Sequence, residues 1–142
     1  MRVEEVMSEA TCRDESDSVK DCARAMREES IGFLPICSQN GEPVGAITDR
    51  DLAIRVLADG RSADEEISTF MTRAVVSCRT GDDVKHAEQL MRDHRTSRIV
   101  VCDDDGKVAG VVSLADIADA ESEAVAGQTL QEVKSDRPPA AH

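Results

Sequence analysis

Two short segments of this sequence carry a hydroxyl and a carboxylate at the same spacing. GAITDRD (residues 45–51) and GVVSLAD (residues 110–116) each place Asp three residues after Thr or Ser. Such a pair can cap the start of a helix, each side chain accepting a hydrogen bond from the other residue's backbone N–H. The same carboxylate, at the junction of a strand and a helix, can accept hydrogen bonds from a ribose diol, and the free N–H groups of the helix start attract phosphate. Both interpretations need the same side chains, so the segments alone leave them open.

The two segments belong to an internal repeat, and repeats of this kind decide the organisation of a chain. The copies begin at Met7 and Met71, and from Val19 onward equivalent residues are 65 positions apart. We therefore predict a first motif over residues 1–60, a linker over 61–70, a second motif over 71–127 and a flexible C-terminal tail over 128–142.

Each copy predicts the element order β-α-β-β-α. A short extended piece precedes an amphipathic helix, whose apolar stripe begins at Val19 or Val84, with Asp17 or Ser16 as the cap of the first and Asp82 of the second. Apolar strands over 31–37 and 98–102 then run into Asn-Gly and Asp-Gly, which are signals for two-residue hairpin turns. A return strand leads into the second helix, with Gly60 and Gly127 placed to end it.

A tandem pair of such units, each ending in strand, G-x-x-[ST]-x-x-D and helix, resembles the cystathionine β-synthase (CBS) domain pair, most closely the stand-alone proteins of the hypoxic response protein 1 type. The resemblance implies an α+β fold in which two repeats pack about a pseudo-twofold axis and leave two clefts. It also implies a regulatory module whose partner is an adenosine-containing small molecule (AMP, ADP, ATP or S-adenosylmethionine). Such a module needs no cofactor and pairs as a homodimer.

The expected site residues follow from the repeat and from the resemblance. Asp51 and Thr48 would bind ribose in the first cleft, and Asp116 and Ser113 in the second. Arg50 offers a cation for phosphate, although it can equally be a solvated arginine, and its absence from the second copy predicts unequal clefts. Arg98 would face a neighbouring phosphate. Apolar backbone would line the base at Ala10, Thr11, Phe33, Leu34 and Pro35.

The cysteines support a competing hypothesis. Cys37 and Cys102 are repeat equivalents that end strands, and Cys12 and Cys78 are near-equivalents in the preceding extended pieces. If these pieces neighbour the strands, Cys12 could pair with Cys37 and Cys78 with Cys102. The alternative function is therefore a stress-related structural dimer with vestigial clefts and redox-responsive cysteine pairs. The cysteines can also be interpreted without any redox role, as five small buried hydrophobic residues.

Composition and missing motifs limit the remaining possibilities. A net charge of -12 argues against nucleic acid held by phosphate neutralisation and against an anionic membrane surface. The sequence contains neither the spacing of a zinc site nor a nucleophile motif, so we expect no metal and no enzyme. No apolar run predicts a membrane span or signal peptide, which suggests a cytoplasmic protein that signals to an unknown effector protein.

Overall fold

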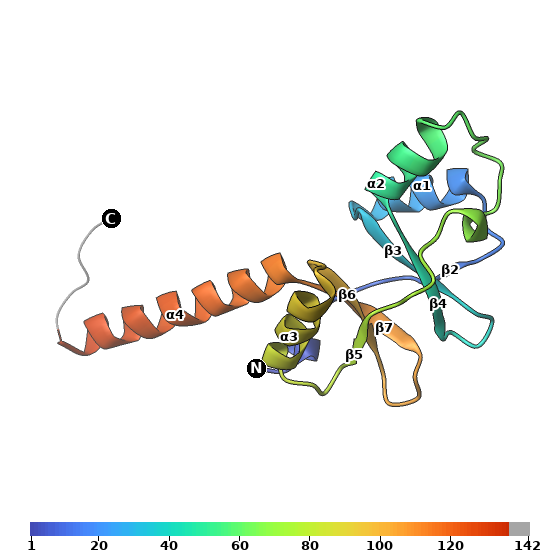
Figure 1. Ribbon diagram of the computed structural model, residues 1–142. Coiled ribbons are helices and arrows are strands. Elements are labelled where there is room, and N and C mark those ends of the chain that lie inside the picture. The colour runs from blue at the N-terminus through green and yellow to red at the C-terminus, as the bar shows by residue number, and fades with distance from the viewer. Residues whose placement is uncertain (137–142) are drawn as a thin grey trace.

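The computed structural model describes residues 1–136 and has two α+β units side by side (Figure 1). The first unit contains a three-stranded sheet in the order β2-β3-β4, and the second a four-stranded sheet in the order β1-β7-β6-β5. In each sheet a parallel pair (β2 with β3, β5 with β6) adjoins an antiparallel hairpin (β3 with β4, β6 with β7). The strands are β1 (Ser8–Glu9), β2 (Arg13–Asp14), β3 (Phe33–Cys37), β4 (Pro43–Thr48), β5 (Ser77–Arg79), β6 (Arg98–Cys102) and β7 (Val108–Ser113).

The helices follow the predicted order in both units. Their bounds are α1 (Val19–Glu29), α2 (Asp49–Asp51), the π-helical η2 (Leu52–Leu57), α3 (Val84–His94) and α4 (Leu114–Asp136), with single 3-10 turns at η1 (Val3–Glu5) and η3 (Ile67–Thr69). The expected β-α-β-β-α pattern and the α+β class are confirmed. None of the helices within residues 1–136 is both long enough and apolar enough to cross a membrane.

The two units exchange their leading segments. The chain's first residues join the second unit, where the Val3 N–H donates to the Asp82 carbonyl at 2.8 Å and β1 pairs with β7. The segment expected to be a linker joins the first unit instead, since the Ile67 N–H donates to the Asp17 carbonyl at 2.8 Å. Val3 and Ile67 are both fully buried, so each unit completes its core with the other's leading segment.

The hairpins differ from the two-residue turns that their sequences suggested. In the first, the Ser38 N–H donates to the Glu42 carbonyl at 2.8 Å, which leaves three residues in the loop, and the Gly41 N–H donates to the Ser38 carbonyl at 2.9 Å. Only the glycine has a positive φ, +82° at Gly41 and +81° at Gly106. A type I′ turn needs positive φ at both central residues, whereas a type I turn followed by one left-handed glycine does not.

Both predicted helix N-caps are wrong. Ser18 and Asp83 are the caps of α1 and α3, one residue later than expected. The Asp17 and Asp82 carboxylates instead accept from backbone N–H groups three residues before them, at 3.2 and 2.9 Å. Gly60 does end its helix region, with φ of +64°.

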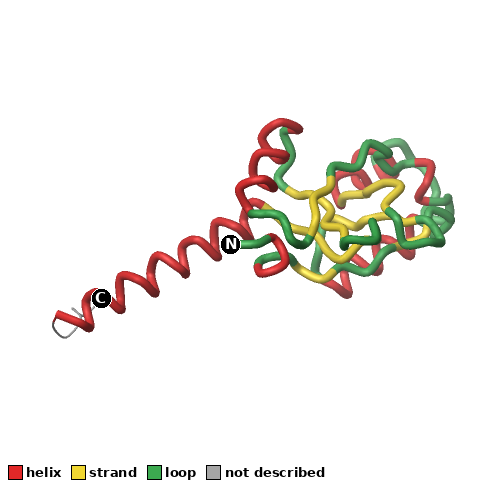
Figure 2. The backbone as a smooth tube through the Cα atoms, turned by 90° about the horizontal axis from the view of Figure 1, so that it is seen from below, coloured by secondary structure: helices red, strands yellow, loops and turns green. Residues whose placement is uncertain are grey.

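The second helix of the second unit does not end at Gly127. Helix α4 continues to Asp136 and projects away from both units (Figures 1 and 2). A single glycine costs a helix about 1 kcal/mol, which good helix formers on both sides can offset. The predicted flexible tail therefore overlaps helical backbone over 128–136, and its last part, 137–142, lies outside the described residues.

Three apolar clusters hold the fold together. One lies between α1 and its sheet around Leu34 and Ile36, and an equivalent one packs α3 against Ile99 and Val101. The third contains Phe33, Val100, Cys102 and Val111, which come from the opposite faces of both sheets. Because successive residues of a strand alternate between faces, β3 and β6 each serve two cores at once.

Candidate functional site

Both hydroxyl-carboxylate pairs form capping boxes in the structure. The Asp51 N–H donates to Thr48 Oγ1 at 3.0 Å, and the Thr48 N–H donates to Asp51 Oδ2 at 3.0 Å. The second pair repeats this arrangement, with the Asp116 N–H 3.0 Å from Ser113 Oγ and the Ser113 N–H 3.2 Å from Asp116 Oδ2. The boxes hold both carboxylates at the end of a strand, where each lines a cavity.

The first cavity has a volume of about 410 Å³. Thr48, Asp51 and Phe33 come from the first unit, and Arg98 comes from β6 of the second. Phe33 reaches this place because it is the direct partner of Thr48 across the β3–β4 hairpin. Its wall is completed by Ala46, Thr72, Ala74, Val75, Val76, His94 and Thr96.

The second cavity is the counterpart of the first and measures about 260 Å³. Ser113 and Asp116 line it, and Arg98 does so again because it pairs with Ser113 across the β6–β7 hairpin. The remaining wall residues are Ser8, Glu9, Glu29, Ser30, Ile31, Gly32 and Val111. The structure therefore brings six of the eleven predicted ligand-binding residues to the two cavities: Phe33, Thr48, Asp51, Arg98, Ser113 and Asp116.

The other five predicted residues are not among those that line either cavity. Leu34 and Pro35 are fully buried, and Leu34 belongs to the core between α1 and its sheet. Ala10 packs against the cluster between the sheets, and Thr11 is exposed beside it. Arg50 is exposed on the first turn of its helix and does not line the first cavity. The basic side chains that line this cavity are Arg98 and His94.

The glycine three residues before each hydroxyl makes room for a neighbouring segment of the chain. In the first copy this glycine is Gly45. A Cβ at this position would lie 2.6 Å from Met71 Sδ and 3.0 Å from the Thr72 carbonyl oxygen, and a Cβ at Gly110 would overlap the Ser8 carbonyl. Both glycines therefore admit the exchanged leading segments against β4 and β7.

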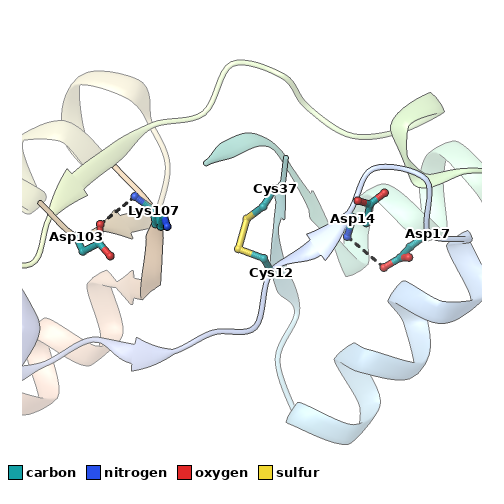
Figure 3. Close-up of a disulfide and its surroundings, with 6 residues drawn as sticks. All are labelled: Cys12, Asp14, Asp17, Cys37, Asp103 and Lys107. Carbon is teal, nitrogen blue, oxygen red and sulfur yellow. Dashed lines mark hydrogen bonds between the residues drawn. A yellow bond between two sulfur atoms is a disulfide. The ribbon is translucent and has the colours of Figure 1, made fainter. Parts of the chain in front are cut away.

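The structure joins one of the two predicted cysteine pairs. A disulfide joins Cys12, next to β2, with Cys37 at the end of β3, and their Cα atoms are 5.6 Å apart (Figure 3). Cys12 lies in the segment between β1 and β2, where the chain crosses from one sheet to the other. The disulfide therefore fixes the point at which the chain passes from the second unit to the first.

The second predicted pair is wrong: Cys78 and Cys102 are free and buried. Cys78 pairs in register with Val101, as Arg13 does with Ile36, so the residue equivalent to Cys12 is Ser77. Adjacent strand residues point to opposite faces, which turns the Cys78 thiol away from Cys102. Burial raises the pKa of the Cys102 thiol, while a hydrogen bond with the Ser77 hydroxyl partly offsets that rise.

The cavity walls also contain residues that sequence reasoning missed. His94 and Thr96, at the end of α3 and just after it, read as ordinary polar residues, and the extended piece expected over 74–79 was given no ligand role. The repeat itself carried the missing signal. The loop between each first helix and its following strand lines the cavity of the other unit, so the pairs 29/94 and 31/96 could have been added by symmetry.

Comparisons with known proteins agree with this geometry. The model of the CBS domain matches residues 3–58 and 65–123, one match for each unit. The chain belongs to the CBS domain family. Among the residues that the structure describes, no group of three or more His, Cys, Asp or Glu side chains is placed to hold a metal ion.

Relatives of this CBS protein include stand-alone proteins and longer ones. It is 30% identical over 109 residues to hypoxic response protein 1 of Mycobacterium tuberculosis, covering 76% of each chain. It is 36% identical over 118 residues to an uncharacterized protein of Methanopyrus kandleri, covering 82% of this chain but only 59% of the relative. Among solved structures, the CBS domain pair of protein MJ0100 with 5′-methylthioadenosine and S-adenosyl-L-methionine has a TM-score of 0.75 and 28% identity, covering 87% of this chain and 97% of that one.

Proposed function

We propose that this CBS pair is a non-catalytic, cytoplasmic regulatory module that binds an adenosine-containing ligand, from the set AMP, ADP, ATP and S-adenosylmethionine. One observation carries the proposal: two hydroxyl-carboxylate pairs at equivalent strand-helix junctions each line a cavity between the units. The similar MJ0100 pair, whose crystal structure is a complex with two adenosine compounds, supports this choice of ligand class.

In the proposed complex each carboxylate accepts hydrogen bonds from a ribose diol. Asp51 and Thr48 do so in the first cleft, and Asp116 and Ser113 in the second. Phe33 supplies an apolar surface for the base of the first ligand. Arg98, at the border of both clefts, donates to phosphate. Arg50 is not needed for this scheme.

Binding would change the packing between units or between copies of the chain, and so signal to an effector protein without chemistry. Three exposed apolar side chains support a homodimer: Ile54 and Leu57 on η2, and Leu114 at the start of α4, which are 50%, 79% and 48% exposed. Light scattering of wild type and Leu57→Glu tests this part of the proposal, because a charge in a dimer interface would give a monomer.

The ligand proposal is tested by thermal unfolding with AMP, ATP and S-adenosylmethionine at millimolar concentration. A ligand at about a hundred times its Kd stabilises the folded state by about 2.7 kcal/mol. Asp51→Ala and Asp116→Ala each remove a capping box, at a cost of about 1 kcal/mol without ligand. Only loss of the ligand-dependent shift, measured against each variant's own baseline, supports a ribose contact; an unchanged shift in both variants, or none in wild type, contradicts the proposal.

The disulfide favours a second candidate, a stress-related dimer whose clefts are vestigial. In that case unfolding temperature would respond to reductant and not to nucleotide. Only Cys12 and Cys37 can serve as its redox pair, since Cys78 and Cys102 face different cores.

A further inference from the structure

The two clefts are built from equivalent positions, so each serves as an internal control for the other. Both keep a hydroxyl, a carboxylate and a share of Arg98. The two clefts differ at the C-terminal ends of α1 and α3 and in the residues that follow them, which line the cavities. His94 and Thr96 stand in the first cleft at the places that Glu29 and Ile31 occupy in the second.

This difference changes the charge of the walls. The second cleft has three carboxylates, Glu9, Glu29 and Asp116, against the guanidinium of Arg98. The first has one carboxylate, Asp51, against Arg98 and the imidazole of His94. Since Arg98 borders both clefts, the clefts differ through the remaining side chains. A cleft with low-dielectric walls focuses such a difference on its ligand.

Helix stability does not explain the carboxylate at Glu29. It is the last residue of α1, where the backbone carbonyls already form the negative end of the helix. The last turn of each helix has a basic residue that suits this end, Arg27 in α1 and Arg92 in α3, and α3 adds His94 at the position of Glu29. Glu29 is therefore unfavourable for its own helix and faces the cavity, and a ligand of opposite charge would benefit from it.

We propose, resting on the proposed binding of adenosine compounds, that the second cleft selects an adenosine whose 5′ substituent is cationic and carries no phosphate, such as a sulfonium nucleoside. The first cleft takes the phosphorylated ligand, and the residue pair His94 and Glu29 sorts the two by charge. Ser113 and Asp116 hold the ribose in the second cleft, while Glu29 and Glu9 attract the cation and repel phosphate.

Isothermal titration with four probes tests this division: adenosine and 5′-methylthioadenosine, which are neutral, AMP, and S-adenosylmethionine. Asp51→Ala leaves the second cleft to be titrated alone, and Asp116→Ala leaves the first. In the Asp51→Ala background we expect S-adenosylmethionine to bind about tenfold more tightly than 5′-methylthioadenosine, and AMP to bind more weakly than adenosine. In the Asp116→Ala background we expect AMP to bind more tightly than adenosine. Both preferences should weaken as salt is raised.

Charge exchange then identifies the sorting residues. In the Asp51→Ala background, Glu29→His should lower the affinity for S-adenosylmethionine about tenfold and change that for 5′-methylthioadenosine little. In the Asp116→Ala background, His94→Glu should lower the affinity for AMP about tenfold and change that for adenosine little. Glu28→His, which changes the net charge equally on the neighbouring helix position away from the cavity wall, is the matched control. Glu29→Gln, which only removes the charge, should give an intermediate loss, and circular dichroism verifies that each variant is folded.

The outcomes separate the two proposals. If none of the four probes binds the wild-type protein, this inference falls, and the proposed function falls with it if ADP and ATP do not bind either. If the neutral probes bind but both clefts rank AMP and S-adenosylmethionine alike, the function stands and the sorting by charge is overturned. It is equally overturned if Glu28→His shifts the preference as much as Glu29→His does.

Discussion

The two oxygens of the Asp51 carboxylate have different surroundings. Oδ2 accepts a hydrogen bond from the Thr48 N–H at 3.0 Å, whereas Oδ1 lies 3.8 Å from Arg55 Nε, in a long ion pair. An exposed pair at this distance contributes little to stability. A ribose hydroxyl could therefore take Oδ1 without breaking the cap, so capping and binding, which the sequence presented as alternatives, can be satisfied together by one side chain.

The free thiols provide a prediction at the same scale. Burial raises the pKa of Cys22 to about 11 and that of Cys78 to about 12, and it also raises the pKa of Cys102. At pH 8 only about one Cys22 thiol in a thousand would be ionised, and the thiolate is the reactive form. We expect no rapid reaction of the native, unreduced protein with a disulfide reagent at pH 8, and a faster reaction as pH rises towards 10.

Unfolding gives the control for this measurement. In denaturant the three free cysteines should react, and after reduction all five. Five reactive thiols in denaturant without reductant would mean that Cys12 and Cys37 are not joined, and one prompt thiol in the native protein would mean that a buried cysteine is accessible.

At the scale of elements, the repeat predicted the order of helices and strands because apolar periodicity survives in both copies. It did not predict strand register. The match of TCR with SCR placed Cys78 opposite Cys102, but the offset of 65 that holds from Val19 onward makes Ser77 the equivalent of Cys12. Local similarity misled here because one extra residue precedes β5, and a slip of one residue exchanges the two faces of a strand.

The cavity walls show a similar limit. Thr48 and Asp51 could be predicted because each copy of the repeat contains the hydroxyl and the carboxylate within one short segment. His94 and Glu29 are the last residues of α3 and α1 and line the cleft of the other unit, and which helix end meets which cleft depends on how the sheets face each other. Only long-range packing supplies that information, which is why five predicted residues fell outside the walls.

The register leads to a test. Ser77→Cys should form a second disulfide with Cys102, over the same sequence separation of 25 residues as the native bond. Cross-linking a loop of this length stabilises a domain by about 3 kcal/mol through the unfolded state, provided the geometry is unstrained. Peptide mapping by mass spectrometry would identify the bond and urea unfolding its effect, with the Ser77→Cys, Cys102→Ser double variant as control. A bond from Cys78 to Cys102 would contradict the register.

At the scale of the whole molecule, the exchange of leading segments joins two units that look separable in sequence. The Thr72 N–H and the Ala46 carbonyl bond at 2.9 Å, and the Ala46 N–H bonds back to the Thr72 carbonyl at the same distance, so the start of the second motif is held by the first unit's sheet. The clefts lie beside both exchanges, since Thr72 lines the first and Ser8 the second. A ligand in either cleft would therefore contact chain segments whose cores lie in different units.

Val3 and Ile67 allow a test of this exchange, because they are equivalent positions of the repeat and both are fully buried. Val3 lies in the core of the second unit, and Ile67 lies in the core of the first. Val3→Ala should cost about 2 kcal/mol and Ile67→Ala somewhat more, since each leaves a cavity. Hydrogen exchange shows where the loss falls. Val3→Ala should raise exchange first in α3 and leave α1 protected, although residue 3 precedes α1 in sequence, and Ile67→Ala should do the reverse. Increased exchange in α1 with Val3→Ala would mean that the leading segment belongs to its own motif. The crossing that builds both clefts would then be absent in solution.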